Sequence, residues 1–229
     1  MPLRVIGGEL GGRVLRGPPR SGVRPTTDRV REALFEILTA CGAPMRRVLD
    51  LYSGTGAMGI EAMSRGGEWC DFVESDAKAC EVIRENLRRT GLQGRAKLWP
   101  MTVARAISRL GEESGIRASG QSGKAADATF EDAGASTRLP DPLPSRVEGN
   151  NEPEERRKGY DLVVADPPYE YDRAEAELAL VVESGLLAEG GTLVVEHSQR
   201  REWPEMLGSL AQMDSRRYGD TRVTLYGRG

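Results

Sequence analysis

Val48–Gly59 reads VLDLYSGTGAMG, and this stretch decides the fold. Its first five residues are almost continuously apolar, as in a strand that is buried on both faces of a parallel sheet. The turn that follows fits the pattern G-x-G-x-x-G at Gly54, Gly56 and Gly59. A strand, a glycine-rich turn and a helix in succession expose backbone N–H groups at the helix N-terminus, where a nucleotide-type ligand can bind. Ordinary turns produce the same glycine spacing, so this pattern needs support from other motifs.

An acidic residue ends the next predicted strand, Cys70–Glu74. Glu74 lies twenty residues after Gly54, the spacing at which a carboxylate at the end of a second strand reaches a ribose diol. Taken alone, Glu74 could equally be a solvated carboxylate at a strand end.

A third motif, Asp166-Pro167-Pro168-Tyr169, follows the predicted buried strand Tyr160–Ala165. The two prolines fix φ and remove two N–H donors, so the backbone leaves the strand extended, with its carbonyl groups presented. Asp166 and the Pro167 carbonyl can then accept both hydrogens of a planar amino group, while Tyr169 stacks on the ring that carries it. A turn with no chemistry is the plain alternative, and the two upstream motifs argue against it.

This arrangement suits methyl transfer to an amine. An amine on an aromatic base is a poor nucleophile because its lone pair is delocalised into the ring. Two acceptors that draw its hydrogens toward tetrahedral geometry free that lone pair for attack on an electrophilic methyl group. No strong base is needed, so positioning and preorganised electrostatics carry the rate.

The sequence resembles the S-adenosylmethionine-dependent methyltransferases that act on exocyclic amino nitrogens, and more closely the bacterial small-subunit (16S) rRNA guanine-N2 methyltransferase family. The match covers the chain except for roughly residues 111–158. The segments that carry it are Arg4–Gly8, Arg24–Glu32, Asp50–Gly59, Glu74, Asp166–Tyr169, Tyr218–Thr221 and Val223–Tyr226.

The resemblance implies a class I methyltransferase that uses S-adenosylmethionine to methylate N2 of a guanine in 16S rRNA, as naked RNA or within a small subunit or an assembly intermediate. The residues that it implies for catalysis are Asp166, Pro167, Pro168 and Tyr169. Those that it implies for cofactor binding are Asp50, Tyr52, Ser53, Gly54, Gly56, Gly59, Glu74 and Ser75. To these we add Met101, which can cover the adenine face, and Thr102, which can accept a hydrogen bond from the adenine. The family usually has an acidic residue after the third strand, next to the adenine, where this chain has Pro100–Val103.

Charge is unevenly distributed along the chain. The net charge of −3 does not by itself indicate a nucleic-acid binder, but residues 1–31 hold seven arginines against two acids, a balance of +5. Residues 111–158 hold ten acids and seven bases, a balance of −3. A basic terminal segment can bind RNA phosphates or simply keep the protein soluble. With the resemblance, we expect RNA contacts from Arg4, Arg13, Arg16, Arg24 and Arg29.

We expect an α/β fold with a doubly wound, mainly parallel sheet of seven strands that ends in an antiparallel hairpin. Residues 1–28 are predicted to form a basic N-terminal arm, and residues 29–229 the methyltransferase domain. Residues 111–158 contain few large apolar side chains, so they are predicted to be a disordered insertion. We also expect a helix over Arg173–Ser184 with Ala176, Leu180 and Val181 facing inward, and a short helix from Trp203 on.

Other features exclude classes of function. Three cysteines without a C-x-x-C pair indicate reduced thiols in a cytoplasmic protein and no metal site. No apolar run is long enough to span a membrane, and the first residues do not form a signal peptide. His197, the single histidine, is predicted to have a structural role at the end of a strand, since no Ser-His-Asp or metal cluster accompanies it.

Three alternatives remain open at this point. An adenine-N6 methyltransferase acting on DNA or RNA would use Asp166–Tyr169 equally well. A nicotinamide dehydrogenase would use the same glycine pattern, but it leaves that tetrapeptide unexplained. A non-enzymatic RNA chaperone would use the arm and keep a pocket without activity.

Overall fold

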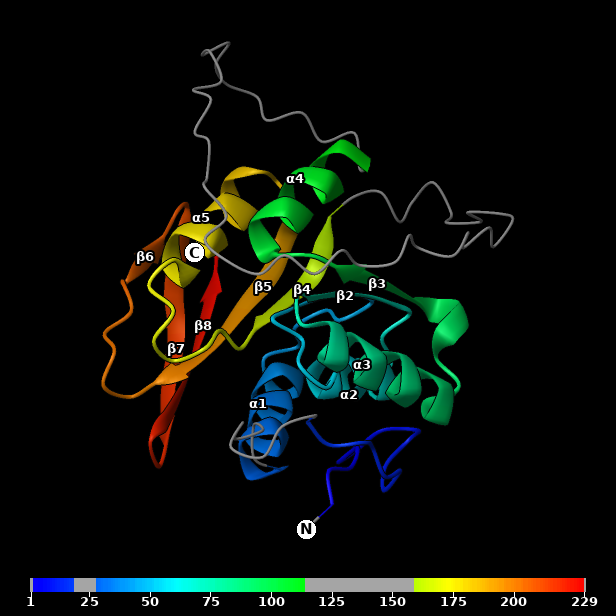
Figure 1. Ribbon diagram of the computed structural model, residues 1–229. Coiled ribbons are helices and arrows are strands. Elements are labelled where there is room, and N and C mark those ends of the chain that lie inside the picture. The colour runs from blue at the N-terminus through cyan, green and yellow to red at the C-terminus, as the bar shows by residue number, and fades with distance from the viewer. Residues whose placement is uncertain (1, 19–27, 114–158, 229) are drawn as a thin grey trace.

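A mixed sheet of eight strands forms the centre of the protein, in the order β3-β2-β1-β4-β5-β8-β7-β6 (Figure 1). The structure is a computed structural model that describes residues 2–18, 28–113 and 159–228. The strands are β1 (Arg47–Leu51), β2 (Trp69–Glu74), β3 (Ala96–Pro100), β4 (Tyr160–Ala165), β5 (Leu187–Ser198), β6 (Met206–Leu207), β7 (Leu210–Tyr218) and β8 (Thr221–Gly227). The helices are α1 (Asp28–Ala40), α2 (Ala57–Ser64), α3 (Ala77–Thr90), α4 (Val103–Glu113) and α5 (Ala174–Glu183), with a 3₁₀ turn, η1 (Gln93–Arg95).

The strand order reverses beside β1. This strand pairs in parallel with β2 on one side and with β4 on the other. The chain therefore proceeds from β1 to β3 in one direction and from β4 to β5 in the other, and the loops after β1 and β4 leave the sheet next to each other. In an open α/β sheet, a ligand binds in the crevice at such a reversal.

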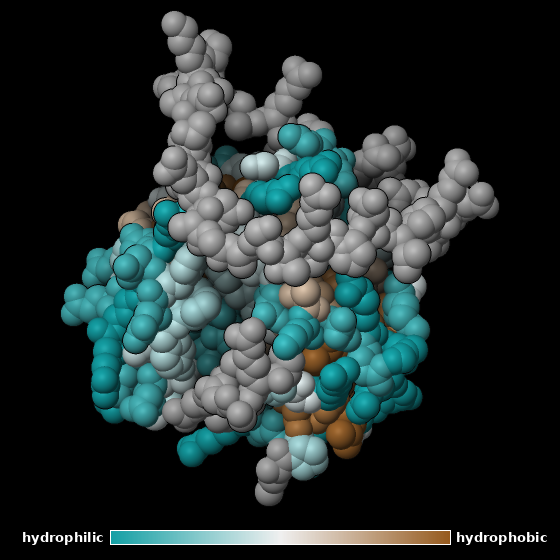
Figure 2. Space-filling view, in the orientation of Figure 1, coloured by the Kyte–Doolittle hydropathy of each residue, from teal (hydrophilic) through white to brown (hydrophobic). Residues whose placement is uncertain are grey.

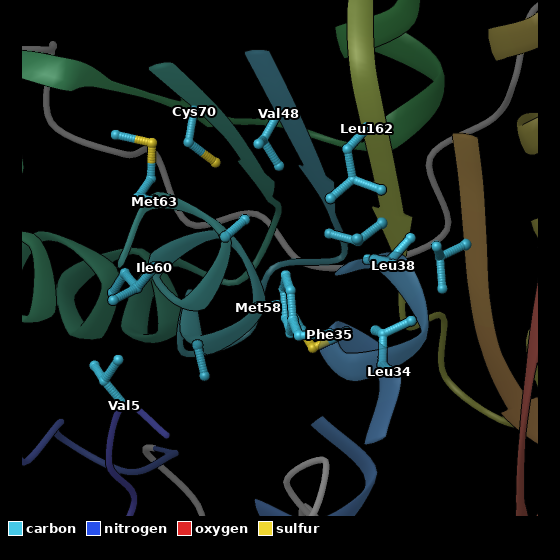
Figure 3. Close-up of a cluster of buried hydrophobic side chains, with 14 of the residues drawn as sticks. Val5, Leu34, Phe35, Leu38, Val48, Met58, Ile60, Met63, Cys70 and Leu162 are labelled. Carbon is cyan, nitrogen blue, oxygen red and sulfur yellow. The ribbon is translucent and has the colours of Figure 1, made fainter. Parts of the chain in front are cut away.

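Helices cover both faces of the sheet. Side chains of α1, α2 and α3 pack with one set of strand residues, and those of α4 and α5 pack with the set on the opposite face. Figure 3 shows the first layer, where Leu34, Phe35 and Leu38 of α1 approach Met58 of α2 and the strands above. The strands carry long apolar runs because both of their faces are buried.

Gly59 is a glycine because helix α2 lies very close to strand β2. A Cβ atom at this position would lie 2.5 Å from the Phe72 ring and 2.7 Å from Cys70 Sγ. Any larger residue would push the helix, and the loop before it, away from the sheet.

The described part of the N-terminal arm, residues 2–18, packs against the body of the protein. Val5, Leu10 and Leu15 are buried in the same layer as α1 and α2. The backbone N–H groups of Ile6 and Gly7 donate to the buried Glu61 carboxylate over 2.7 and 2.9 Å. Figure 3 shows Val5 of the arm facing Ile60 of α2. In Figure 2, hydrophilic residues dominate the described surface, and several apolar residues appear low on the right, where Figure 1 places the arm.

The expected order of strands and helices is confirmed, with three corrections. The sheet has eight strands rather than seven, because residues after Trp203 form β6 where a short helix was predicted. Leu207 and Leu210 are both buried, and Gly208 with φ +59° turns the chain between them, so a hairpin replaces the helix. The predicted insertion also begins too early, since residues 111–113 belong to α4. The rest of that segment, from residue 114 to 158, lies outside the described residues.

Candidate active site

A cavity of about 780 Å³ lies at the carboxyl ends of β1, β2 and β4. It is within the size range of cofactor sites. Twelve of the fourteen residues predicted for catalysis and cofactor binding line it: Asp50, Tyr52, Ser53, Gly54, Glu74, Ser75, Met101, Thr102, Asp166, Pro167, Pro168 and Tyr169. The three motifs, which together span more than a hundred residues of the sequence, thus meet around one space.

Gly56 and Gly59 are the two predicted residues that do not line this cavity. Gly56 precedes α2 with φ +76°, and Gly59 packs on β2 as described above. Their place is behind the loop, where they allow the chain to turn and the helix to approach the sheet.

Glu74 holds the glycine-rich loop in position. Its carboxylate accepts hydrogen bonds of 2.8 Å from the backbone N–H of Gly54 and from that of Asp76. The Ser53 hydroxyl donates to the Asp50 carbonyl over 2.7 Å, which closes the turn after β1. The loop is thereby ordered by the protein itself before any ligand binds.

Asp50 is a buried carboxyl group under this loop. It is 2% exposed, and its Oδ2 accepts a 2.8 Å hydrogen bond from the Gly59 N–H. Burial raises the pKa of Asp50 to about 8, and the nearby Asp166 and Glu74 carboxylates act in the same direction, while the hydrogen bond from Gly59 opposes the shift. A cationic ligand in the cavity would favour the ionised form of this group.

Glu177 of α5 connects the loops that follow β1 and β4. The Tyr52 hydroxyl donates to Oε2 over 2.5 Å, and the Tyr171 hydroxyl donates to Oε1 over 2.8 Å. The two tyrosine rings also meet edge to face at 6.0 Å. Tyr52 has φ +56°, an uncommon conformation for a residue with a side chain, and the hydrogen bond to Glu177 holds it there.

The loop after β4 is fixed from further sides. Tyr171 N–H donates to the Pro168 carbonyl over 2.8 Å, and the Arg201 guanidinium donates to the Tyr171 carbonyl over 2.8 Å. The Tyr169 and Thr221 hydroxyls are hydrogen-bonded at 2.8 Å, which ties the loop to the last hairpin. Tyr169 remains 42% exposed at the edge of the cavity, so its ring is available for stacking.

Arg31 of α1 lines the cavity although the sequence did not predict it as a site residue. It is completely buried, and one amino group of its guanidinium, Nη2, donates to the Arg4 carbonyl over 2.6 Å and to Asp28 over 2.9 Å. Its Nε lies 3.8 Å from the Glu61 carboxylate. Burial lowers the pKa of Arg31, and the charges of Glu61 and Asp28 oppose that shift.

The predicted RNA-binding arginines lie elsewhere. The Arg4 side chain pairs with Asp28 at 3.4 Å, Arg13 donates to the Arg89 carbonyl over 3.1 Å, and Arg16 and Arg29 are exposed. None of these four lines the cavity, whereas Pro18 of the arm does. Arg24 lies outside the described residues.

His197 is buried away from the cavity. Its ring nitrogens lie 2.9 Å from the Thr224 hydroxyl and 3.0 Å from the Ser198 carbonyl, and Trp203 packs beside the ring. Burial lowers its pKa to about 4, so the ring is neutral near pH 7. These contacts suit the predicted structural role.

The described residues hold neither a candidate metal site nor a helix that could span a membrane. They contain no group of three or more histidine, cysteine, aspartate or glutamate side chains placed to hold a metal ion. None of their helices combines the length and apolar character that crossing a membrane requires.

The model of one protein family, described as "Conserved hypothetical protein 95", matches residues 3–116 and 144–227. The chain belongs to this family. A relative from Bacillus subtilis (strain 168), named "Putative rRNA methyltransferase YlbH", is 30% identical over 227 residues, which cover 98% of each chain. The "Ribosomal RNA small subunit methyltransferase D" of Escherichia coli (strain K12) is 42% identical over 88 residues, which cover 37% of this chain and 42% of that protein.

Solved structures have the same fold as this family member. A hypothetical protein of Thermus thermophilus superposes with a TM-score of 0.69 at 25% identity, covering 98% of this chain and 99% of that one. An Escherichia coli protein described as "Putative methyltransferase yhhF" superposes with a TM-score of 0.67 at 26% identity, covering 99% of this chain and 97% of that one. These similarities confirm the family and the methyltransferase fold that the sequence predicted.

Proposed function

We propose that this protein transfers a methyl group from S-adenosylmethionine to the exocyclic N2 amine of a guanine in small-subunit rRNA. The observation that carries the proposal is the meeting of Asp166–Tyr169 with the glycine-rich loop in one cavity at the reversal of strand order. The names of the relatives, which include rRNA methyltransferases, support RNA as the substrate.

The lining of the cavity fits the cofactor. S-adenosylmethionine supplies, when bound, a methyl group that is electrophilic because it is attached to a positively charged sulfur. Asp50 and the loop Tyr52–Gly54 would hold the methionine end, and Met101 and Thr102 the adenine. Glu74 would hold the ribose hydroxyls, since each of its oxygens accepts one backbone hydrogen bond and has a second lone pair left.

The residues after β4 would prepare the amine. Asp166 and the Pro167 carbonyl accept its two hydrogens and favour the tetrahedral geometry in which the lone pair is available. The two prolines fix φ of the backbone, and the hydrogen bond between the Tyr169 and Thr221 hydroxyls holds the stacking ring. The acceptors would therefore be in place before the reaction. The nitrogen becomes acidic as it is methylated, so its proton can pass to water without a strong base.

The basic arm would bind the RNA backbone in the cytoplasm. Arg4, Arg13, Arg16 and Arg29 are on the surface, and we assign phosphate contacts to them and to Arg24. Such contacts supply affinity that falls with increasing salt, and they do not choose the base. A guanine inside a folded rRNA would have to leave its stack to reach Asp166.

The test is transfer of labelled methyl groups from S-adenosylmethionine to small ribosomal subunits from cells that lack the protein, followed by digestion to nucleosides. We expect N2-methylguanosine. N6-methyladenosine would instead establish the alternative adenine-N6 activity, and naked 16S rRNA in a parallel assay shows whether assembly matters.

A variant of Asp166 separates the rate of methyl transfer from the affinity for the cofactor, when both are measured. Asp166→Ala removes one of the two acceptors, and we expect methyl transfer to fall by at least about a hundredfold while cofactor affinity is nearly unchanged. Asp172→Ala, an exposed residue of the same loop, is the matched control. An equal loss of transfer and cofactor binding in Asp166→Ala would contradict the role assigned to this carboxylate.

A further inference from the structure

Two nitrogens of the Arg31 guanidinium, Nε and Nη1, have no hydrogen-bond partner among the described residues. Nη2 donates to the Arg4 carbonyl and to Asp28, and Nε lies 3.8 Å from the Glu61 carboxylate, which leaves Nη1 for a further acceptor. Buried polar groups are nearly always paired, and leaving a charged donor unpaired destabilises the folded state. Since Arg31 lines the cavity, a bound ligand can supply the missing acceptor.

The charges around the cavity indicate what kind of acceptor this is. Arg31 is the one basic residue among the described residues that line the cavity. The acidic residues in the same lining are Asp50, Glu74, Asp76, Asp166 and Glu177. Among the described residues of this lining, Arg31 is therefore the group that offers a positive charge to a ligand carboxylate.

The guanidinium is also fixed before a ligand binds. Its bonds to the Arg4 carbonyl and to Asp28, together with the Glu61 carboxylate, hold it in one orientation. A donor that needs no reorganisation loses little entropy on binding, and arginine forms strong charge-assisted hydrogen bonds with carboxylates.

We propose that Arg31 binds the α-carboxylate of the methionine half of S-adenosylmethionine through Nη1. This rests on the proposed function, which supplies the cofactor. Of the groups in that cofactor, only the carboxylate is anionic, so it is the group that the single cation of the lining selects. Helix α1, which precedes the glycine-rich loop in the sequence, would thus contact the cofactor directly.

The experiment compares two ligands by titration calorimetry. S-adenosylhomocysteine retains the carboxylate, whereas 5′-(3-aminopropylthio)-5′-deoxyadenosine keeps the adenosine, the thioether and the amine and lacks only the carboxylate. The wild-type protein should bind S-adenosylhomocysteine at least about tenfold more tightly than the analogue without the carboxylate, which is the difference expected for one charge-assisted hydrogen bond. In Arg31→Met, S-adenosylhomocysteine should lose that advantage, and the two ligands should bind within about twofold of each other.

Two further variants control for structural damage. Arg65→Met removes another arginine that pairs with Glu61, at 2.8 Å, but does not line the cavity, so it should preserve the preference for the carboxylate ligand. Arg31→Lys keeps the charge without the planar fork, and we expect it to retain part of the preference even if Arg31→Met folds poorly.

Several outcomes would overturn the proposal. Equal affinity of the wild-type protein for the two ligands would do so, and so would an Arg31→Met protein that keeps the full preference. A variant that weakens both ligands equally would leave Arg31 only a structural role. If the wild-type protein binds neither ligand, the cofactor itself is wrong, which distinguishes failure of the proposed function from failure of this inference.

Discussion

At the scale of single residues, Asp50 makes the stability of the protein depend on pH. Its pKa is raised from 3.8 to about 8 in the folded state, chiefly by burial. Between these two values the folded protein holds a proton that the unfolded chain releases. Folding therefore takes up a proton in this window, and the free energy of unfolding falls as the pH rises from about 4 to 8.

Asp50→Asn should remove this dependence. The amide oxygen can still accept the hydrogen bond from Gly59, but nothing titrates. The decrease in the free energy of unfolding between pH 5 and pH 8 should be roughly 2–4 kcal/mol smaller in the variant than in the wild-type protein. Urea denaturation at each pH measures it. Asp172→Asn is an exposed control that should behave as the wild type does. Parallel pH profiles for the wild-type protein and Asp50→Asn would contradict the raised pKa.

Arg31 lines the cavity, but the sequence did not predict it as a site residue. Residues 31, 34, 35 and 38 form one stripe of α1, and all four are fully buried, so helical periodicity places Arg31 in the interior. An arginine is expected on the surface, however, and the prediction assigned RNA contact to the exposed Arg29 instead. The groups that allow burial, the Glu61 carboxylate at 3.8 Å and the Arg4 carbonyl that accepts a hydrogen bond, come from other elements, and no local pattern predicts their approach.

At the scale of secondary-structure elements, α5 supports the site from the side. Glu177 is 7% exposed, and both of its carboxylate oxygens accept a tyrosine hydroxyl. One tyrosine follows β1 and the other follows β4, so this helix connects the loop that we propose binds the cofactor with the loop that we propose prepares the amine.

A double-mutant cycle of Tyr52→Phe and Tyr171→Phe tests this connection. Each change leaves a Glu177 oxygen without its hydroxyl donor, and we expect each to lower the free energy of unfolding by about 1–3 kcal/mol. Because both donors share one carboxylate, the double variant should deviate from additivity by at least about 0.5 kcal/mol. Both single variants should also raise the KM for S-adenosylmethionine.

Tyr226→Phe is the matched control for this cycle. Its hydroxyl donates to the Pro204 carbonyl over 2.7 Å, in the last hairpin. The loss of stability should be similar, whereas the KM for the cofactor should stay the same. Additive effects of the two loop tyrosines, or the same rise in KM for Tyr226→Phe, would show that Glu177 does not couple the loops.

The sequence predicted the elements better than their orientation. The parallel strands were found because uninterrupted apolar runs between turn residues are characteristic of doubly buried strands. Helix α5 was expected to turn Ala176, Leu180 and Val181 inward, but Ala176 and Leu180 are exposed, and Leu178 and Val181 are buried. Its sequence, AEAELALVVE, is apolar on most sides, so periodicity did not fix its rotation, and Glu177 was missed for that reason.

At the scale of the whole molecule, the fold was predictable because its decisive motifs lie at strand ends. Ser53–Gly54 and Asp166–Tyr169 follow parallel strands, and Glu74 is the last residue of one. The carboxyl ends of such strands meet at one edge of the sheet. The match of the family model to residues 3–116 and 144–227 follows the same core. Where the two stretches are joined, the chain adds a segment that the family model does not match.

That segment gives the last prediction, a deletion of residues 117–143. The segment between Glu113 and Gly159 would shorten from 45 residues to 18. If this segment serves only as a connection, shortening it should raise the free energy of unfolding by about 0.8 kcal/mol, because loop-closure entropy depends on the logarithm of length. Methyl transfer should stay within about twofold of the wild type, because every residue assigned to the cavity lies outside the deletion. Denaturation and the nucleoside assay measure the two quantities, and a deletion variant that folds but does not methylate would place this segment in the substrate-binding site.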